Sequence, residues 1–127
     1  MSVLTRRIAI ALPALFIGAA PHAAPVPPPV RAEIEALLNR LQASGCEFSR
    51  NGTWYSGTDA KVHLLRKLEA MESRTTVHST GQFIEAGATT SSASGQAYQV
   101  RCGGAVPMPS RQWLSMQLAA LRAIGRP

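Results

Sequence analysis

The chain has 127 residues, which is the length of a single domain. Hydrophobic residues make up 46% of the sequence, enough to build a packed core, and this excludes wholesale disorder. Charged residues make up only 16%, and the net charge is +6. This surplus is modest and spread along the chain, so it does not indicate a nucleic-acid partner.

Residues 1–24 have the layout of a secretory signal peptide. MSVLTRR is a short basic segment, IAIALPALFIGAA is an apolar run, and PHAAP supplies small residues for cleavage. The run is shorter than the roughly 20 apolar residues of a membrane span, so we expect no stable span after cleavage. The alternative is a buried N-terminal helix, which Pro13 and the basic flank disfavour. We therefore expect an exported, periplasmic protein.

Two cysteines, Cys46 and Cys102, remain in the exported part of the chain. An oxidising compartment makes a disulfide between them the default expectation. It would close a long loop, worth roughly 4 kcal/mol in the chain-entropy model. A redox-active pair would be closely spaced, and a zinc site needs more ligands than the sequence offers at suitable spacing. We expect no metal and no cofactor.

The helical segments follow from apolar spacing and from capping residues. PVPPP (25–29) is expected to be a stiff linker that precedes a single domain over 30–127. A first helix is predicted from Val30 to Ser44, where leucines and isoleucine recur at helical spacing. Ser56 begins a second helix with Asp59 in a capping box, and Ser79 begins a short third helix that ends at Gly87. Ser110 is expected to cap the last helix.

Three strands are predicted between these helices. CEFSR and TWY flank Asn51-Gly52, the strongest short signal for a two-residue hairpin turn, and QAYQVRC alternates later in the chain. GGAVPMP, which follows, is expected to be a turn-rich connection. Cys46 begins the first strand and Cys102 ends the third, so antiparallel pairing would bring the two sulfurs together. We therefore predict an α+β fold, a three-stranded antiparallel sheet with about four helices packed on one face.

Several motifs resemble those of a family of small exported proteins of Gram-negative bacteria that has no assigned activity. The motifs are Cys-x-Phe, Arg-Asn-Gly, His-Leu, Ser-Ser-x-Ser-Gly-x-x-Tyr and a late Trp-Leu, spread over about residues 31–122. The resemblance implies a periplasmic location in a Gram-negative bacterium and supports the fold, but it implies no function. Members of that family often have Lys directly before the Ser pair, where this chain has Thr90.

Two chemical interpretations compete for the polar residues. Asp59, His63 and a Ser of the 91–94 loop run in the order of one serine-hydrolase arrangement, but the loop lacks the Gly-x-Ser-x-Gly pattern. The other interpretation is a site for a small polar or anionic ligand. Its candidate residues are Arg50, Asn51, His63, Lys67, Ser91, Ser92 and Ser94. The Ser-rich loop also fits a turn whose hydroxyls bond their own backbone.

We favour a binding or interaction module over an enzyme, with a small periplasmic hydrolase that uses His63 and a loop Ser as the alternative. An envelope protein or a small polar or anionic ligand is the expected partner, and neither the ligand nor the partner is specified by the sequence. Asp59 is explained by its capping position, which weakens the hydrolase interpretation.

Overall fold

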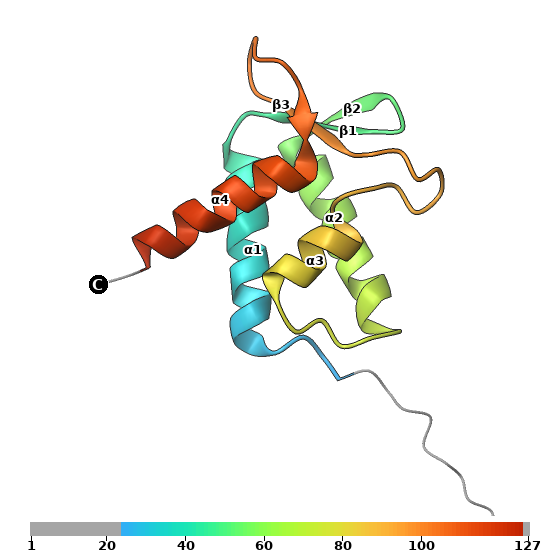
Figure 1. The fold of residues 1–127 in the computed structure, drawn as a ribbon, viewed down its shortest axis with the longest axis vertical. Coiled ribbons are helices and arrows are strands. Elements are labelled where there is room, and N and C mark those ends of the chain that lie inside the picture. Colours follow the sequence, from blue (N-terminus) through green and yellow to red (C-terminus); the bar gives the residue numbers. More distant parts are fainter. Residues whose placement is uncertain (1–23, 126–127) are drawn as a thin grey trace, which may run out of the picture.

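Four helices and four short strands make up the computed structural model, which describes residues 24–125 (Figure 1). In chain order they are α1 (Pro28–Ala43), β1 (Glu47–Arg50), β2 (Thr53–Ser56), α2 (Gly57–Glu72), α3 (Thr80–Gly87), β3 (Gln99–Arg101), β4 (Met108–Pro109) and α4 (Ser110–Ile124). The predicted signal peptide lies almost entirely outside the described residues. Within residues 24–125, no helix combines the length and the apolar character that crossing a membrane requires.

The strands form one antiparallel sheet in the order β2-β1-β3-β4. Phe48 in β1 lies opposite Tyr55 in β2 and opposite Val100 in β3, so these three side chains lie on the same face of the sheet. The sheet has four strands rather than the predicted three, because Met108 pairs with Val100 within the expected connection. A two-residue strand is too short to show periodicity, and its proline is tolerated because β4 is an edge strand.

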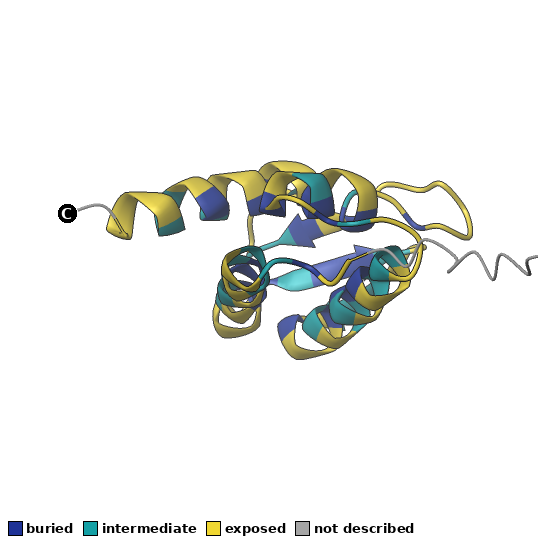
Figure 2. Cartoon of the chain, turned by 90° about the horizontal axis from the view of Figure 1, so that it is seen from below, coloured by how far each residue is buried: buried dark blue, intermediate teal, exposed yellow. Residues whose placement is uncertain are grey.

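The helices pack against the inner face of the sheet. Figure 2, which views the molecule from below, shows buried strand residues between the surrounding helices. The core joins Phe48, Tyr98 and Val100 of the sheet side to leucines and other apolar residues of all four helices. Cys46 directly precedes β1 and Cys102 directly follows β3, and they form the predicted disulfide. The predicted α+β architecture is therefore confirmed, apart from the fourth strand.

Local signals placed most element ends correctly. Asn51 and Gly52 have positive φ angles of 52° and 80°, as the predicted hairpin turn requires. The Ser56 and Ser79 side chains accept hydrogen bonds from the backbone N–H groups of Asp59 and Gln82, at 3.1 and 3.0 Å. These serines therefore cap α2 and α3 as predicted.

Two element starts differ from the prediction. Helix α1 begins at Pro28, inside the expected linker. The backbone N–H of the first helical position has no partner within the helix, so proline, which lacks this N–H, is favoured there. Val26, also in that segment, is buried in the core. The expectation that Ser110 caps α4 is wrong. Pro109 occupies the cap position, and the buried Ser110 hydroxyl instead donates to the Ala88 carbonyl.

Candidate ligand-binding site

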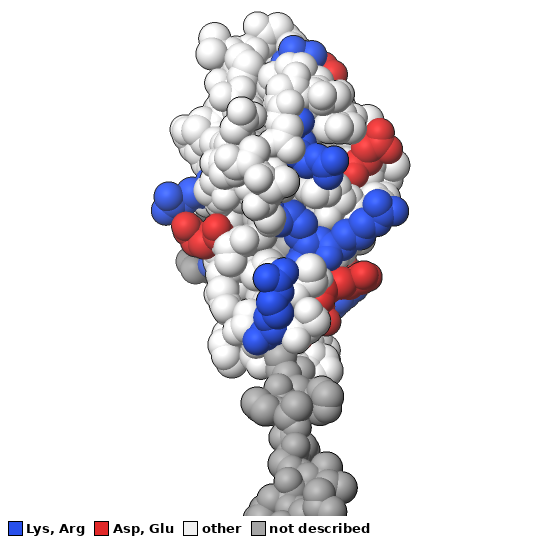
Figure 3. Space-filling view, turned by 90° about the vertical axis from the view of Figure 1, so that its right-hand side faces the viewer, with Lys and Arg blue, Asp and Glu red and all other residues white. Residues whose placement is uncertain are grey.

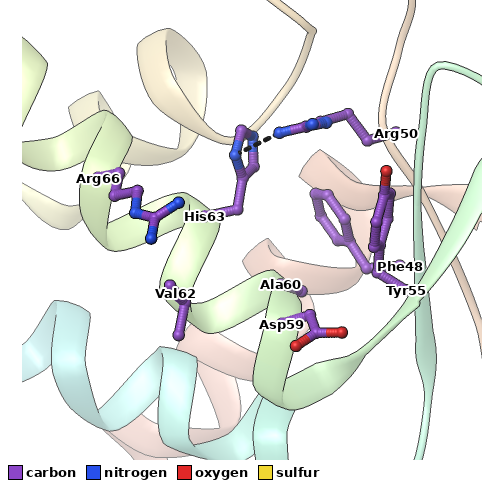
Figure 4. A pocket seen from close by; sticks show the side chains of 8 residues that line it. All are labelled: Phe48, Arg50, Tyr55, Asp59, Ala60, Val62, His63 and Arg66. Carbon is purple, nitrogen blue, oxygen red and sulfur yellow. Dashed lines mark hydrogen bonds between the residues drawn. The ribbon is translucent and has the colours of Figure 1, made fainter.

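A cavity of about 330 Å³ lies between the β1–β2 hairpin and α2. We call it the α2 cavity; Figure 4 shows its eight lining side chains. They are Phe48, Arg50, Tyr55, Asp59, Ala60, Val62, His63 and Arg66. The volume falls at the lower end of the range that is typical of small-molecule sites.

Strand alternation and helical spacing bring these side chains together. In β1, Phe48 and Arg50 are two residues apart and therefore lie on the same face of the sheet. In α2, Asp59, His63 and Arg66 are separated by four and three residues, so they follow one another along one side of the helix. Because the short hairpin leads directly into α2, the sheet and this helix face each other across the cavity.

A chain of polar contacts begins with Arg50 and His63, which line the cavity, and extends to Tyr98 and Lys67. Nη1 of Arg50 lies 2.7 Å from Nδ1 of His63, and Nε2 of His63 lies 3.0 Å from the Tyr98 hydroxyl oxygen. Nζ of Lys67 donates to the same hydroxyl at 3.0 Å and to the Thr90 carbonyl at 2.8 Å. Arginine can only donate, so Nδ1 of His63 must accept and Nε2 must carry the proton. The neutral Nε2–H tautomer of His63 therefore satisfies both contacts.

Burial and neighbouring cations keep His63 uncharged. Its pKa is lowered from 6.5 to about 4, first by burial and then by the charges of Arg50, Lys67 and Arg66. Burial and the charge of Arg50 also lower the pKa of Lys67, and burial raises the pKa of Tyr98. At neutral pH the positive charge of this region therefore rests on Arg50, Arg66 and Lys67.

No acidic side chain among residues 24–125 forms an ion pair with these three cations. The five ion pairs of the described chain join other residues, for example Arg111 with Glu85 and Arg122 with Glu33. Figure 3 shows Lys and Arg side chains gathered across the middle of one face, with acidic side chains toward its margins. We call Arg50, Arg66 and Lys67, with the neutral His63 between them, the basic cluster.

A family model matches residues 28–122, which is most of the chain. The chain belongs to the DUF5329 family, a family of unknown function. No curated protein and no solved structure matches the chain. The matched region of this DUF5329 protein runs from the first residue of α1 into α4, so it includes the α2 cavity and both cysteines.

The structure brings some of the predicted ligand-binding residues of the DUF5329 chain together and separates others. Arg50, His63 and Lys67 belong to the basic cluster, although the sequence did not show that their side chains meet. Ser91 is buried, and its backbone forms hydrogen bonds within the 91–96 loop. The Ser94 hydroxyl donates to the Asn51 side-chain oxygen and accepts from the Gln96 N–H. These loop residues therefore bond among themselves and with the hairpin turn.

Ser92 and His63 do not face one another across a common cavity. Ser92 is exposed and lines a second hollow beside Lys67, between α2 and α3. Both ring nitrogens of His63 are already engaged, by Arg50 and by Tyr98. Within the described residues no serine hydroxyl forms a hydrogen bond with His63, so the arrangement lacks the nucleophile–base contact of a serine hydrolase. The same residues contain no group of three or more His, Cys, Asp or Glu side chains that suits a metal ion.

Sequence reasoning missed three residues that shape the site: Tyr55, Tyr98 and Arg66. It considered Asp59 as a hydrolase residue and as a helix cap, but not as part of a ligand site. Helical spacing offered a signal for Asp59 and Arg66, because they lie four residues before and three after His63. For Tyr98 there was no local signal, since its contact with His63 spans 35 residues of sequence.

Proposed function

We propose that this DUF5329 protein is an exported, periplasmic binding module whose α2 cavity holds the negatively charged group of a small ligand. The observation that carries this proposal is the basic cluster at a cavity. Three cations surround a neutral histidine, and none of them has an acidic partner among the described residues.

Like charges at close range repel one another, and partial burial strengthens that repulsion by lowering the effective dielectric constant. Burial and the charge of Arg50 already disfavour the charged form of Lys67. An anion in the α2 cavity would offset this repulsion, so the ligand-free cluster favours anion binding.

The donors that remain available suit a carboxylate or a phosphate. Arg50 uses Nη1 on His63, which leaves its other N–H groups for a ligand. Arg66 is exposed and forms no hydrogen bond or ion pair within residues 24–125, so its whole guanidinium group is available. The planar fork of a guanidinium matches the oxygens of carboxylate and phosphate groups.

Two observations support the proposed compartment. Residues 1–24 have the composition of a signal peptide, and a disulfide of the kind formed by Cys46 and Cys102 persists in oxidising compartments. The motifs quoted above favour a Gram-negative source, whose periplasm is such a compartment.

Thermal unfolding in the presence of small anions tests the proposal. Phenylacetate and inorganic phosphate are titrated against the mature protein at constant ionic strength, with chloride as the reference salt. A ligand that binds only the folded state stabilises it by about 2.7 kcal/mol at a hundredfold excess over Kd. We expect a saturable rise in Tm with at least one of the two anions.

Two arginine variants assign the response to the cavity. Arg50→Gln should abolish the rise in Tm, whereas Arg111→Gln should keep it, because Arg111 forms an exposed ion pair with Glu85 outside the cavity. A response equal to that of chloride, or one that survives in Arg50→Gln, would contradict anion binding at this site.

A further inference from the structure

The α2 cavity is not lined by cations alone. Asp59 lies at the end of the cavity opposite Arg50 and His63 (Figure 4). Its backbone N–H is bonded to the Ser56 hydroxyl, but its carboxylate forms no reciprocal bond to close the capping box. Within residues 24–125 this carboxylate has neither a hydrogen-bond donor nor an ion-pair partner. It is therefore available to a cationic group in the cavity.

The two kinds of charge are well separated along α2. Asp59 and Arg66 are seven residues apart, which corresponds to about 10 Å along the helix axis. Ala60 and Val62 lie between them on the helix, and Tyr55 faces the helix from the hairpin on the side of Ala60. A negative end, an uncharged middle that contains Tyr55, Ala60 and the neutral His63, and a positive end therefore follow one another along the cavity.

Resting on the anion site proposed above, we propose that the ligand is a short peptide with free ends, about three residues long. Its carboxylate is bound by Arg50 and Arg66, its ammonium group by Asp59, and an apolar side chain packs on Tyr55. An extended chain spans about 3.3–3.6 Å per residue, so three residues match the separation of the two charged ends. A single amino acid holds its two charges too close together to reach both ends.

Charge complementarity and size both favour this class of ligand. A purely anionic ligand would leave the Asp59 carboxylate unpaired beside it, whereas a zwitterion pairs with both ends of the cavity. A segment inside a long protein chain carries neither terminal charge. The cavity of about 330 Å³ also suits a small molecule rather than a folded partner.

Isothermal titration calorimetry with three forms of one peptide tests the inference. The probes are Ala-Phe-Ala with free ends, its N-acetylated form, which lacks the ammonium charge, and its C-terminal amide, which lacks the carboxylate. We expect the free peptide to bind about fivefold more tightly than the acetylated form, as a partly exposed ion pair allows. The amide should bind most weakly, because it loses both arginine contacts.

Single substitutions on α2 separate the two charged ends. Asp59→Asn should remove the advantage of the free peptide over the acetylated form and leave the acetylated form unaffected. Arg66→Gln should weaken both carboxylate-bearing peptides. Glu69→Gln, on an exposed part of the same helix outside the cavity, is the matched control and should change nothing.

The possible failures are distinguishable. Equal affinity for the free and acetylated peptides, unchanged by Asp59→Asn, would overturn the zwitterion inference and leave the anion site standing. If Ala-Phe-Ala and its acetylated form both fail to bind while phenylacetate or phosphate still raises Tm, the peptide inference alone is overturned. If neither peptide carboxylates nor small anions bind, the proposed function is overturned as well.

Discussion

At the scale of single residues, the hydrogen-bond partners of His63 fix its tautomer and its charge. Its Nδ1 accepts from Arg50 and its Nε2 donates to Tyr98, and both contacts require the neutral ring. The sequence identified His63 as a candidate ligand-binding residue. Both of its hydrogen-bond partners are side chains, contributed by a strand and by the segment before β3.

The pH dependence of stability follows from this environment. The pKa of His63 is about 4 in the folded protein against 6.5 ordinarily, so the unfolded chain binds more protons between those values. The stabilising contribution is therefore complete above pH 6.5 and is lost as pH falls toward 4. For a group fully shielded from solvent, the free energy of unfolding would fall by about 1.4 kcal/mol per pH unit. For the half-buried His63 the fall should be smaller, because solvent screens its charge.

Urea unfolding between pH 7 and pH 4.5 measures this effect in the wild type and in His63→Gln. The variant should show a shallower decline of the unfolding free energy with falling pH. Carboxylates and the exposed His78 are common to both proteins, so their contributions cancel in the comparison. Parallel declines in the two proteins would show that His63 is not held neutral by its surroundings.

At the scale of elements, the close packing of α1 against α2 depends on Gly57. This glycine is buried at the first position of α2, where the helix meets the carboxyl end of α1. A Cβ atom there would collide with the Leu41 carbonyl oxygen and lie 3.0 Å from the Cα of Gln42. The sequence did not single out Gly57, because close approach between two helices leaves no local signature.

Replacing this glycine should therefore loosen the helix pair. We expect Gly57→Ala to lower the unfolding free energy by about 1–3 kcal/mol, since backbone atoms of α1 would have to move. Gly81→Ala in α3 is the control, because the nearest atom to its new Cβ is the Ser79 hydroxyl at 3.9 Å. It should leave stability unchanged or raise it by up to about 1 kcal/mol. Similar losses in both variants, measured by urea unfolding, would argue against the collision.

At the scale of the whole molecule, the disulfide joins the two central strands of the sheet. Cys46 and Cys102 are separated by 56 residues, and their Cα atoms lie 4.3 Å apart. The bridge therefore encloses β1, β2, α2, α3 and β3, including the α2 cavity. Its loss acts mainly on the unfolded chain, whose gain in conformational entropy grows with the logarithm of the length of the closed loop.

Removing the bridge should cost a large part of the stability. The double variant Cys46→Ser/Cys102→Ser is expected to lose about 4 kcal/mol, out of a total of about 5–15 kcal/mol for a domain of this size. Urea unfolding measures the loss, and the wild type in reducing buffer should approach the variant while the variant itself is insensitive to reductant.

Mass spectrometry of protein from a periplasmic fraction should show no free thiol and a chain that begins near residue 24. Two free thiols would contradict the bridge in that compartment, and an intact N-terminus would contradict the export.

The sequence by itself determined the helices, the hairpin, the caps of α2 and α3, and the cysteine pairing. Each of these depends on residues a few positions apart, or on strand ends that alternation places on one face. Only the tertiary structure decided the pairing of β4, the burial of Ser110, the close approach at Gly57 and the partners of His63. The last three depend on groups such as Tyr98 and Ala88 that are far away along the chain, and no local pattern encodes a contact of that kind. Strand β4 pairs with the neighbouring β3, but two residues are too few for periodicity to show. For the same reason, the charged residues of the α2 cavity were visible in the sequence, whereas their arrangement around one cavity was not.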